Sequence, residues 1–330
     1  MVVQHPDGLA TTPVAQVPES SEGEQSNWLI RDLWSAVAVG VIGGPPKACK
    51  SWLGLDMAVS VASGTPCLGR FHVQTPGPTV VFLAEDSPTS VRQRVTHICQ
   101  QRGIGLQSLP LHVITTPALR LDLESYRKAL DVTLTALKPR LLLLDPLVRL
   151  HRCDENSAAE ISALLGHLRE INRRHDVAIV LTHHMAKRQR RDLGQGLRGS
   201  SDIHAWTDSA CYLVRRSDGV IRLTVEHRSA IAPEPLLLRL ATDNGHPPHL
   251  EVHGEDADAH AQPLLEAVRS ILRTAKGPKT RAQLRSELRV NNTRLGVALV
   301  ELERRHLAIR TAKGWSYPEP TTPVQLSITA

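Results

Sequence analysis

The residues best suited to chemistry lie between Gly43 and Ser51, where the chain reads Gly-Gly-Pro-Pro-Lys-Ala-Cys-Lys-Ser. A glycine-led loop that ends in Lys-Ser, between a strand and a helix, is the context of a phosphate-binding loop (P-loop). Its backbone N–H groups and the positive end of the following helix form an anion cradle. There Lys50 reaches the β- and γ-phosphates of ATP, and the Ser51 hydroxyl binds Mg²⁺. The expected nucleotide-binding residues are Gly44, Pro45, Pro46, Lys47, Ala48, Cys49, Lys50, Ser51 and Trp52.

The segments on either side of this loop have the required patterns. Ala36–Ile42 is a short, uncharged run that predicts a buried strand, and apolar residues recur at helical spacing from Leu53 to Ala62. One position departs from the usual motif, because Cys49 replaces its second glycine. The Cys49 side chain must point away from the phosphates, and a positive φ there costs energy. The alternative is a tight strand–helix turn that binds no ligand.

Strand-like runs alternate with helical patterns through residues 27–252, which is typical of βαβ units and a mostly parallel sheet. The expected strands are Thr79–Ala84, Leu111–Ile114, Arg140–Leu144, Val177–Thr182, Ser209–Arg215 and Val220–Glu226, the last two as an antiparallel hairpin. The expected helices cover residues 88–102, 123–137 and 158–174. In an open parallel sheet, ligands bind beyond the carboxyl ends of the strands. The residues that follow each strand are therefore the next candidates.

Acidic residues follow two of these strands. Asp145 closes a strand of four leucines, and a buried acid needs a charge partner, so Asp145 is the expected carrier of the Mg²⁺ shell. An ordinary strand-ending turn is the alternative. Glu85 is the candidate base that orients the attacking water, and Asp86 could serve in either role. The alternative for Glu85 is an acid favoured by the helix dipole ahead of Pro88.

His183 and His184 follow another strand. Adjacent strand residues point in opposite directions, so they chelate a metal poorly. We expect one of them to sense the γ-phosphate, with a merely packed or exposed histidine as the alternative. The loop that follows, residues 186–202, combines glycines with cations and suits contact with a phosphate backbone, unless it is simply solvated. Its candidate nucleic-acid contacts are Lys187, Arg188, Arg190, Arg191 and Arg198.

Composition limits the classes of protein to consider. The chain has 330 residues, of which 41% are hydrophobic, enough for one large domain and one small one. It contains neither an apolar run that could span a membrane nor a signal peptide, and its five cysteines lie far apart. We therefore expect a cytoplasmic protein with reduced thiols and no zinc site. Residues 1–26 have four acidic residues and no Lys or Arg, and their composition predicts disorder.

The C-terminal segment has a different character. Residues 262–318 carry twelve Lys or Arg residues against four Glu, which hints at nucleic acid. Three helical patterns, the second Arg281–Leu288, precede the hairpin pattern Ala308–Tyr317, an order that resembles a winged helix-turn-helix. Asn292 and Arg294, near the start of the third helix, would then contact DNA. Winged helices also bind proteins, so this alternative stays open.

Five segments together carry a resemblance to a known family: GGPPKACKSWLGLDMAVSVASG, VVFLAEDS, RLLLLDPLVRLH, IVLTHHMAK and LRGSSDIHAWTD. In this order and spacing they resemble the RecA-like ATPases related to plasmid RepA hexameric helicases, of the AAA_25 type. The resemblance covers about residues 28–240. It implies an oligomer, possibly a hexameric ring, with nucleotide at subunit interfaces and DNA in a central channel. It maps the catalytic glutamate to Glu85, the metal-shell aspartate to Asp145 and the sensor to His183 or His184.

The resemblance also implies an arginine finger from the neighbouring subunit. Arg228 is the best match, with Arg215 and Arg216 behind it. Related rings often have a lysine two positions before the finger, and here that residue is Glu226.

The sequence therefore predicts an α/β protein with a RecA-like P-loop NTPase core and a small winged-helix domain. The expected segments are a disordered tail (1–26), an ATPase domain (27–252), a linker (253–261), a winged helix (262–318) and a disordered tail (319–330). The expected function is Mg²⁺-dependent ATP hydrolysis on DNA, as a replicative or mobile-element helicase. The alternative is a nucleotide-gated DNA-binding regulator or initiator that does not unwind. A metabolic P-loop kinase is disfavoured, because no second acceptor site is visible.

Overall fold

The computed structural model describes residues 12–16, 27–154, 157–185, 202–242, 247–255, 261–275, 277–288, 290 and 292–318. Two compact units divide the chain, Met1–Gly254 and Glu255–Ala330. No helix within these described residues is long and apolar enough to cross a membrane.

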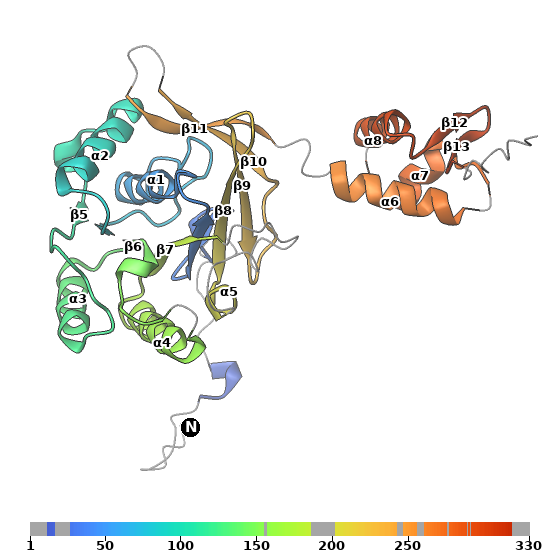
Figure 1. Cartoon of the computed structure of the whole chain (residues 1–330). Helices are drawn as coiled ribbons and strands as arrows, with labels where there is room; N and C mark the ends of the chain where they lie inside the picture. Colours follow the sequence, from blue (N-terminus) through green and yellow to red (C-terminus); the bar gives the residue numbers. More distant parts are fainter. Residues whose placement is uncertain are drawn as a thin grey trace, which may run out of the picture. The chain divides into compact units, whose positions relative to one another are not determined.

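The first unit is built on one large sheet (Figure 1). Within the described residues the sheet has nine strands in the order β11–β10–β9–β8–β3–β7–β6–β4–β5. Its strands are β3 (Val39–Gly44), β4 (Thr79–Leu83), β5 (Leu111–Val113), β6 (Leu141–Asp145), β7 (Ala178–His184), β8 (Ser209–Arg215), β9 (Ile221–His227), β10 (Leu236–Ala241) and β11 (His249–Glu255). The strands from β5 to β8 are parallel, whereas β9 pairs antiparallel with both β8 and β10.

Helices cover both faces of the parallel strands. They are α1 (Lys50–Ser63), α2 (Pro88–Arg102), α3 (Glu124–Leu137), α4 (Ala158–His175) and the short α5 (Asp202–Trp206). In β6, Leu141 and Leu143 pack in the same core as α1 and α2, whereas Leu142 and Leu144 pack with α3 and α4. Burial on both faces explains why this strand reads as an unbroken run of leucines. The predicted α/β class with a mostly parallel central sheet is confirmed.

Local sequence signals set the ends of several helices. Ser87 accepts a hydrogen bond from the Ser90 N–H at the start of α2, with Pro88 in the first turn. In the second unit, Thr280 and Gln283 exchange side-chain and backbone hydrogen bonds in a capping box that begins α7 (Arg281–Leu288). These helices begin where the sequence predicts.

The strand before the P-loop starts later than predicted. Trp34 and Ser35 form the short strand β2, which pairs with β1 (Trp28–Ile30), and the chain turns at Val37 with a φ of 48°. A left-handed residue interrupts an extended strand, so β3 begins only at Val39 and continues to Gly44. The prediction of one strand over Ala36–Ile42 is therefore wrong at both ends.

The late strands β10 and β11 are absent from the sequence expectations. The structure places β11, His249–Glu255, across the expected boundary between the ATPase domain and the linker of residues 253–261. Of the expected N-terminal tail, the structure describes residues 12–16, which contain the 3₁₀ turn η1 (Val14–Gln16). The rest of the tail and residues 319–330 lie outside the described residues.

The described residues of the second unit form three helices and a hairpin. They are α6 (Ala261–Thr274), α7, α8 (Asn292–Arg304), β12 (Ile309–Thr311) and β13 (Gly314–Ser316). Val268, Leu284 and Leu299, one from each helix, pack with Trp315 in a core of the unit's own. An antiparallel bridge joins Lys279, before α7, to Trp315 of β13.

Candidate functional site

The P-loop lies between β3 and α1, as predicted. β3 ends at Gly44, and α1 begins at Lys50. A side chain at Gly44 would bring its Cβ within 2.6 Å of the Leu213 carbonyl oxygen on the neighbouring strand, so only glycine fits there. Cys49 adopts a left-handed conformation (φ 64°, ψ 28°) at the turn into the helix. Cys49 thus adopts the left-handed conformation that a glycine at this position of the motif would supply.

Lys50 is held in the loop by backbone carbonyls. Its side chain is buried, and its Nζ atom donates to the carbonyl oxygens of Gly44 and Pro45, each at 3.0 Å. Burial lowers the pKa of Lys50, and the negative charges of Asp145 and Glu85 oppose that shift. An ammonium group is therefore fixed within the loop, and a loop of this kind can bind an anionic phosphate.

Asp145 lies at the end of β6, close to the P-loop helix. The residue is 6% exposed, its Oδ1 atom accepts a hydrogen bond from the Thr182 hydroxyl, and the Ser51 hydroxyl also donates to the carboxylate. Burial raises the pKa of Asp145, and these two donors and Lys50 oppose the shift. Its buried Oδ2 atom has no hydrogen-bond partner among the described residues. A carboxylate oxygen without a partner beside a serine hydroxyl fits Mg²⁺, which prefers oxygen ligands.

The two acids after β4 have different surroundings. Glu85 is about half exposed, and its Oε1 atom lies 2.9 Å from the Nε atom of Arg149. Asp86 accepts two hydrogen bonds from the Arg94 guanidinium of α2, at 2.8 and 3.0 Å. Asp86 is thus bound to α2, and Glu85 is the acid of this pair with an exposed carboxylate.

His183 and His184 are the last two residues of β7 and differ in burial. His183 is 1% exposed, whereas His184 is half-buried and its Nδ1 atom lies 3.4 Å from the Nζ atom of Lys50. Burial and the charge of Lys50 both lower the pKa of His184. Of the two sensor candidates, His184 is therefore the one beside the P-loop lysine. Across the described residues, no cluster of three or more His, Cys, Asp or Glu side chains could hold a metal ion.

Arg215 and Arg94 contact the P-loop region, although the sequence analysis did not assign either residue to it. Arg215, at the end of β8, donates to the Lys47 carbonyl oxygen at 3.1 Å and to the Cys49 sulfur at 3.6 Å. The Arg94 guanidinium lies over the Trp52 ring, 5.6 Å from its centroid. The signal for Arg215 was its place at a strand end, but only the pairing of β8 with β3 brings it to the loop.

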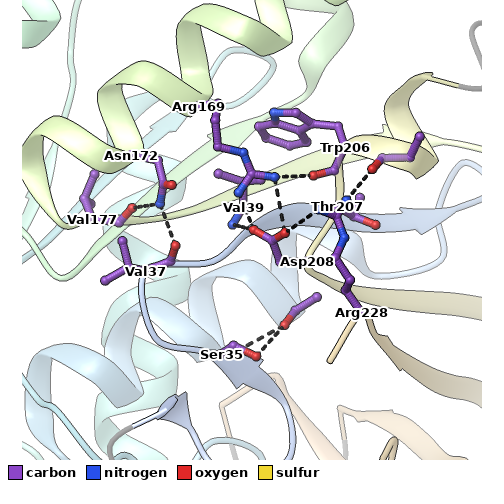
Figure 2. A network of polar contacts seen from close by, with 12 residues as sticks. Ser35, Val37, Val39, Arg169, Asn172, Val177, Trp206, Thr207, Asp208 and Arg228 are labelled. Carbon is purple, nitrogen blue, oxygen red and sulfur yellow. Dashed lines mark hydrogen bonds and ion pairs between the residues drawn. The ribbon is translucent and has the colours of Figure 1, made fainter. Parts of the chain in front are cut away.

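Arg228 lies far from the P-loop of its own chain. His227 pairs with Ser209, and Ser209 pairs with Gly40 near the start of β3, so Arg228 lies at the amino edge of the sheet. The Arg228 guanidinium donates to the Ala205 carbonyl and lies 3.3 Å from Asp208 (Figure 2). In the same network Asp208 also accepts from Arg169 and from the Val39 N–H.

The candidate nucleic-acid contacts are placed only in part. Lys187, Arg188, Arg190, Arg191 and Arg198 lie outside the described residues. The backbones of Asn292 and Arg294 lie in the first turn of α8, and their side chains also fall outside the described parts.

Replacing Cys49 by glycine is expected to stabilise the first unit. A left-handed conformation costs a side-chain-bearing residue about 1–2 kcal/mol, and glycine removes this cost. Glycine also loses more conformational freedom on folding, which offsets part of the stabilisation. We expect Cys49→Gly to raise the midpoint of thermal unfolding by about 1–3 °C. Cys49→Ala keeps the strain and loses the sulfur contact with Arg215, so it should not raise the midpoint. A fall in the Cys49→Gly midpoint would contradict this explanation.

One family model covers the P-loop, Glu85, Asp145 and both histidines. The family model described as an AAA domain, AAA_25, matches residues 6–190, which is more than half of the chain. Among solved structures, the RadB recombinase shares 16% identity at a TM-score of 0.47, over 62% of this chain and 88% of that one. The ATPase domain of G40P shares 12% identity at a TM-score of 0.46, over 62% of this chain and 81% of that one. At such values neither structure informs on activity.

The loop, Lys50, Ser51 and Asp145 all lie within the span that the family model matches. This chain belongs to the AAA_25 family of P-loop ATPases.

Proposed function

We propose that this chain is an oligomeric, Mg²⁺-dependent ATPase that acts on DNA, as a RepA-like helicase of replication or of mobile elements. The single observation that supports the chemistry most is the convergence of side chains at one sheet edge. Lys50 and His184 lie within 3.4 Å, Ser51 donates to Asp145, and Glu85 follows the strand paired with that of Asp145.

The reaction is attack of water on the γ-phosphate. Glu85 orients that water and accepts its proton, while Lys50 neutralises the charge that develops on the phosphate oxygens. A bound Mg²⁺, held by Ser51 and Asp145, would neutralise further charge on the β- and γ-phosphates. His184, in contact with Lys50, senses whether the γ-phosphate is present.

Arg228 acts from a neighbouring subunit in this proposal. It lies at the amino edge of the sheet, so it cannot serve its own P-loop, and about half of its side chain is exposed. An exposed guanidinium can leave a weak ion pair at small cost. The contacts with Asp208 and Ala205 in Figure 2 are therefore the ones it would exchange for a neighbour's γ-phosphate.

DNA contact would come from two places. The basic residues of the loop 186–202 follow β7, which ends at His184, so the chain connects them to the nucleotide site. The second unit, which we infer to be a winged helix, has the order of helices and hairpin that such domains use. That same unit favours the rival function, a nucleotide-gated DNA-binding regulator that never unwinds.

Steady-state ATP hydrolysis with and without single-stranded DNA tests the proposal. We expect single-stranded DNA to stimulate ATP turnover about tenfold or more, because an enzyme that translocates along DNA couples ATP hydrolysis to that movement. ATP binding without stimulated turnover would favour the regulator instead. A strand-displacement assay then separates the two, since only the helicase releases a labelled strand.

A further inference from the structure

A cavity flanks the proposed catalytic glutamate on the side away from the P-loop. Its volume is about 430 Å³, and its lining includes Ala84, Glu85, Pro117, Ala118, Arg120 and Arg149. None of the P-loop residues lines it. Phe82, which also lines the cavity, belongs to the core formed with α3 and α4, whereas α1 packs on the opposite face of the sheet. Glu85 therefore lines a pocket to which no P-loop residue contributes.

Arg149 holds Glu85 at this pocket. Arg149 ends the 3₁₀ turn η4 (Leu147–Arg149), which begins two residues after Asp145. Its Nε atom lies 2.9 Å from the Glu85 Oε1 atom. The turn η4 thus connects Asp145, the proposed Mg²⁺ ligand, with Arg149, which pairs with the proposed base Glu85.

The backbone of this turn is fixed, while the Arg149 side chain can change partners. The Nη1 atom of Arg120 donates to the carbonyl oxygens of Arg149, at 2.7 Å, and His151, at 3.3 Å. The Arg149 side chain itself is 58% exposed and that of Glu85 is 52% exposed. Ion pairs at such exposure are weak, because water screens both charges. An anion with more charge than a carboxylate can therefore displace Glu85.

A phosphate group is the anion that best suits this cavity. It can accept two parallel hydrogen bonds from a guanidinium, and Arg120 supplies a second positive charge on the same wall. A phosphate bound to Arg149 would leave Glu85 without its partner, next to the nucleotide site.

We propose that the Arg120–Arg149 cavity binds a phosphate group, and that Arg149 is a positioning residue that holds Glu85 back until this phosphate displaces it. The inference rests on the proposed function, because it assigns to Glu85 the orientation of water. It adds a route by which a nucleic-acid backbone stimulates ATP hydrolysis. The phosphate can come from that backbone or be free inorganic phosphate, and the experiment separates the two sources.

The test is steady-state ATP hydrolysis by the full-length wild type, Arg149→Gln, Arg149→Lys and Arg152→Gln. Arg152 follows Arg149 by three residues, and its exposed side chain pairs with Asp122, so Arg152→Gln removes a similar charge without touching Glu85. Each protein is assayed alone, with single-stranded DNA, and with inorganic phosphate at constant ionic strength. Thermal unfolding of each variant checks that the fold is kept.

Arg149→Gln is expected to raise basal kcat about two- to fivefold, the range that losing a weak exposed pair allows, with KM for ATP unchanged. Its stimulation by DNA should fall by the same factor, because Glu85 is already free. Arg149→Lys, which keeps the charge, should restore wild-type basal turnover, and Arg152→Gln should match the wild type throughout. A wild type that responds to DNA and not to inorganic phosphate identifies the backbone as the source, and a response to both includes free phosphate.

An Arg149→Gln variant with lower or unchanged basal kcat, or with full stimulation by DNA, overturns the inference. Failure of the proposed function is a separate result. It would show as a wild type without ATP hydrolysis, or as hydrolysis that survives Glu85→Gln in both the wild-type and Arg149→Gln backgrounds.

Discussion

Lys50→Ala is expected to reduce ATP turnover at least about a hundredfold, the size of effect seen when one preorganised charge-stabilising donor is removed. The ammonium group is buried and anchored by the carbonyls of Gly44 and Pro45, so alanine removes the charge that is fixed inside the loop. ATP binding should weaken as well, because the same charge attracts the β- and γ-phosphates in the ground state. Phosphate release and equilibrium nucleotide binding measure the two effects separately.

Lys128→Ala is the matched control for this variant. Lys128 is exposed and pairs with Glu124 one helical turn away, so its removal deletes a lysine and leaves the P-loop intact. It should hydrolyse ATP as the wild type does. Turnover by Lys50→Ala at the Lys128→Ala rate would show that the P-loop is not the nucleotide site.

Glu85→Gln is expected to separate binding from hydrolysis. A glutamine keeps the size of the side chain but cannot accept a proton, so kcat should fall by about 10²–10⁴. The affinity for ATP should change little, because Lys50 and the loop backbone hold the phosphates. The variant should therefore retain bound ATP, which analysis of the bound nucleotide after gel filtration can measure.

Asp86→Asn tests whether the neighbouring acid shares this role. Asp86 is engaged by Arg94 through two hydrogen bonds, so its loss should lower the thermal stability of the first unit and leave kcat close to that of the wild type. If Asp86→Asn loses hydrolysis while Glu85→Gln keeps it, the base has been assigned to the wrong acid.

Much of the fold and the P-loop could be predicted because their signals are local. The glycine-led loop and the four-leucine strand before Asp145 each lie within a few consecutive residues. The same holds for Cys49, whose positive φ follows from the glycine it replaces. The start of β3 was missed because the left-handed turn at Val37 goes against the usual extended preference of a β-branched residue.

The parts that were missed depend on contacts between distant residues. Arg149 and Glu85 are 64 positions apart, and Arg215 and Cys49 are 166 positions apart. Only the order of strands in the sheet brings such pairs together, and no local pattern encodes that order. β11 was missed because its largely polar sequence gives little strand signal, and it joins the sheet edge by pairing with β10. The apolar run of β10, Leu236–Ala241, is a local signal that the sequence analysis did not use.

The most direct measurement is phosphate release from Mg²⁺-ATP by the wild type, Lys50→Ala and Glu85→Gln, purified and assayed side by side. The account predicts turnover by the wild type alone, with ATP still bound by Glu85→Gln and lost from Lys50→Ala. A wild type without turnover, or variants that release phosphate at its rate, would contradict the claim that this edge of the sheet hydrolyses ATP.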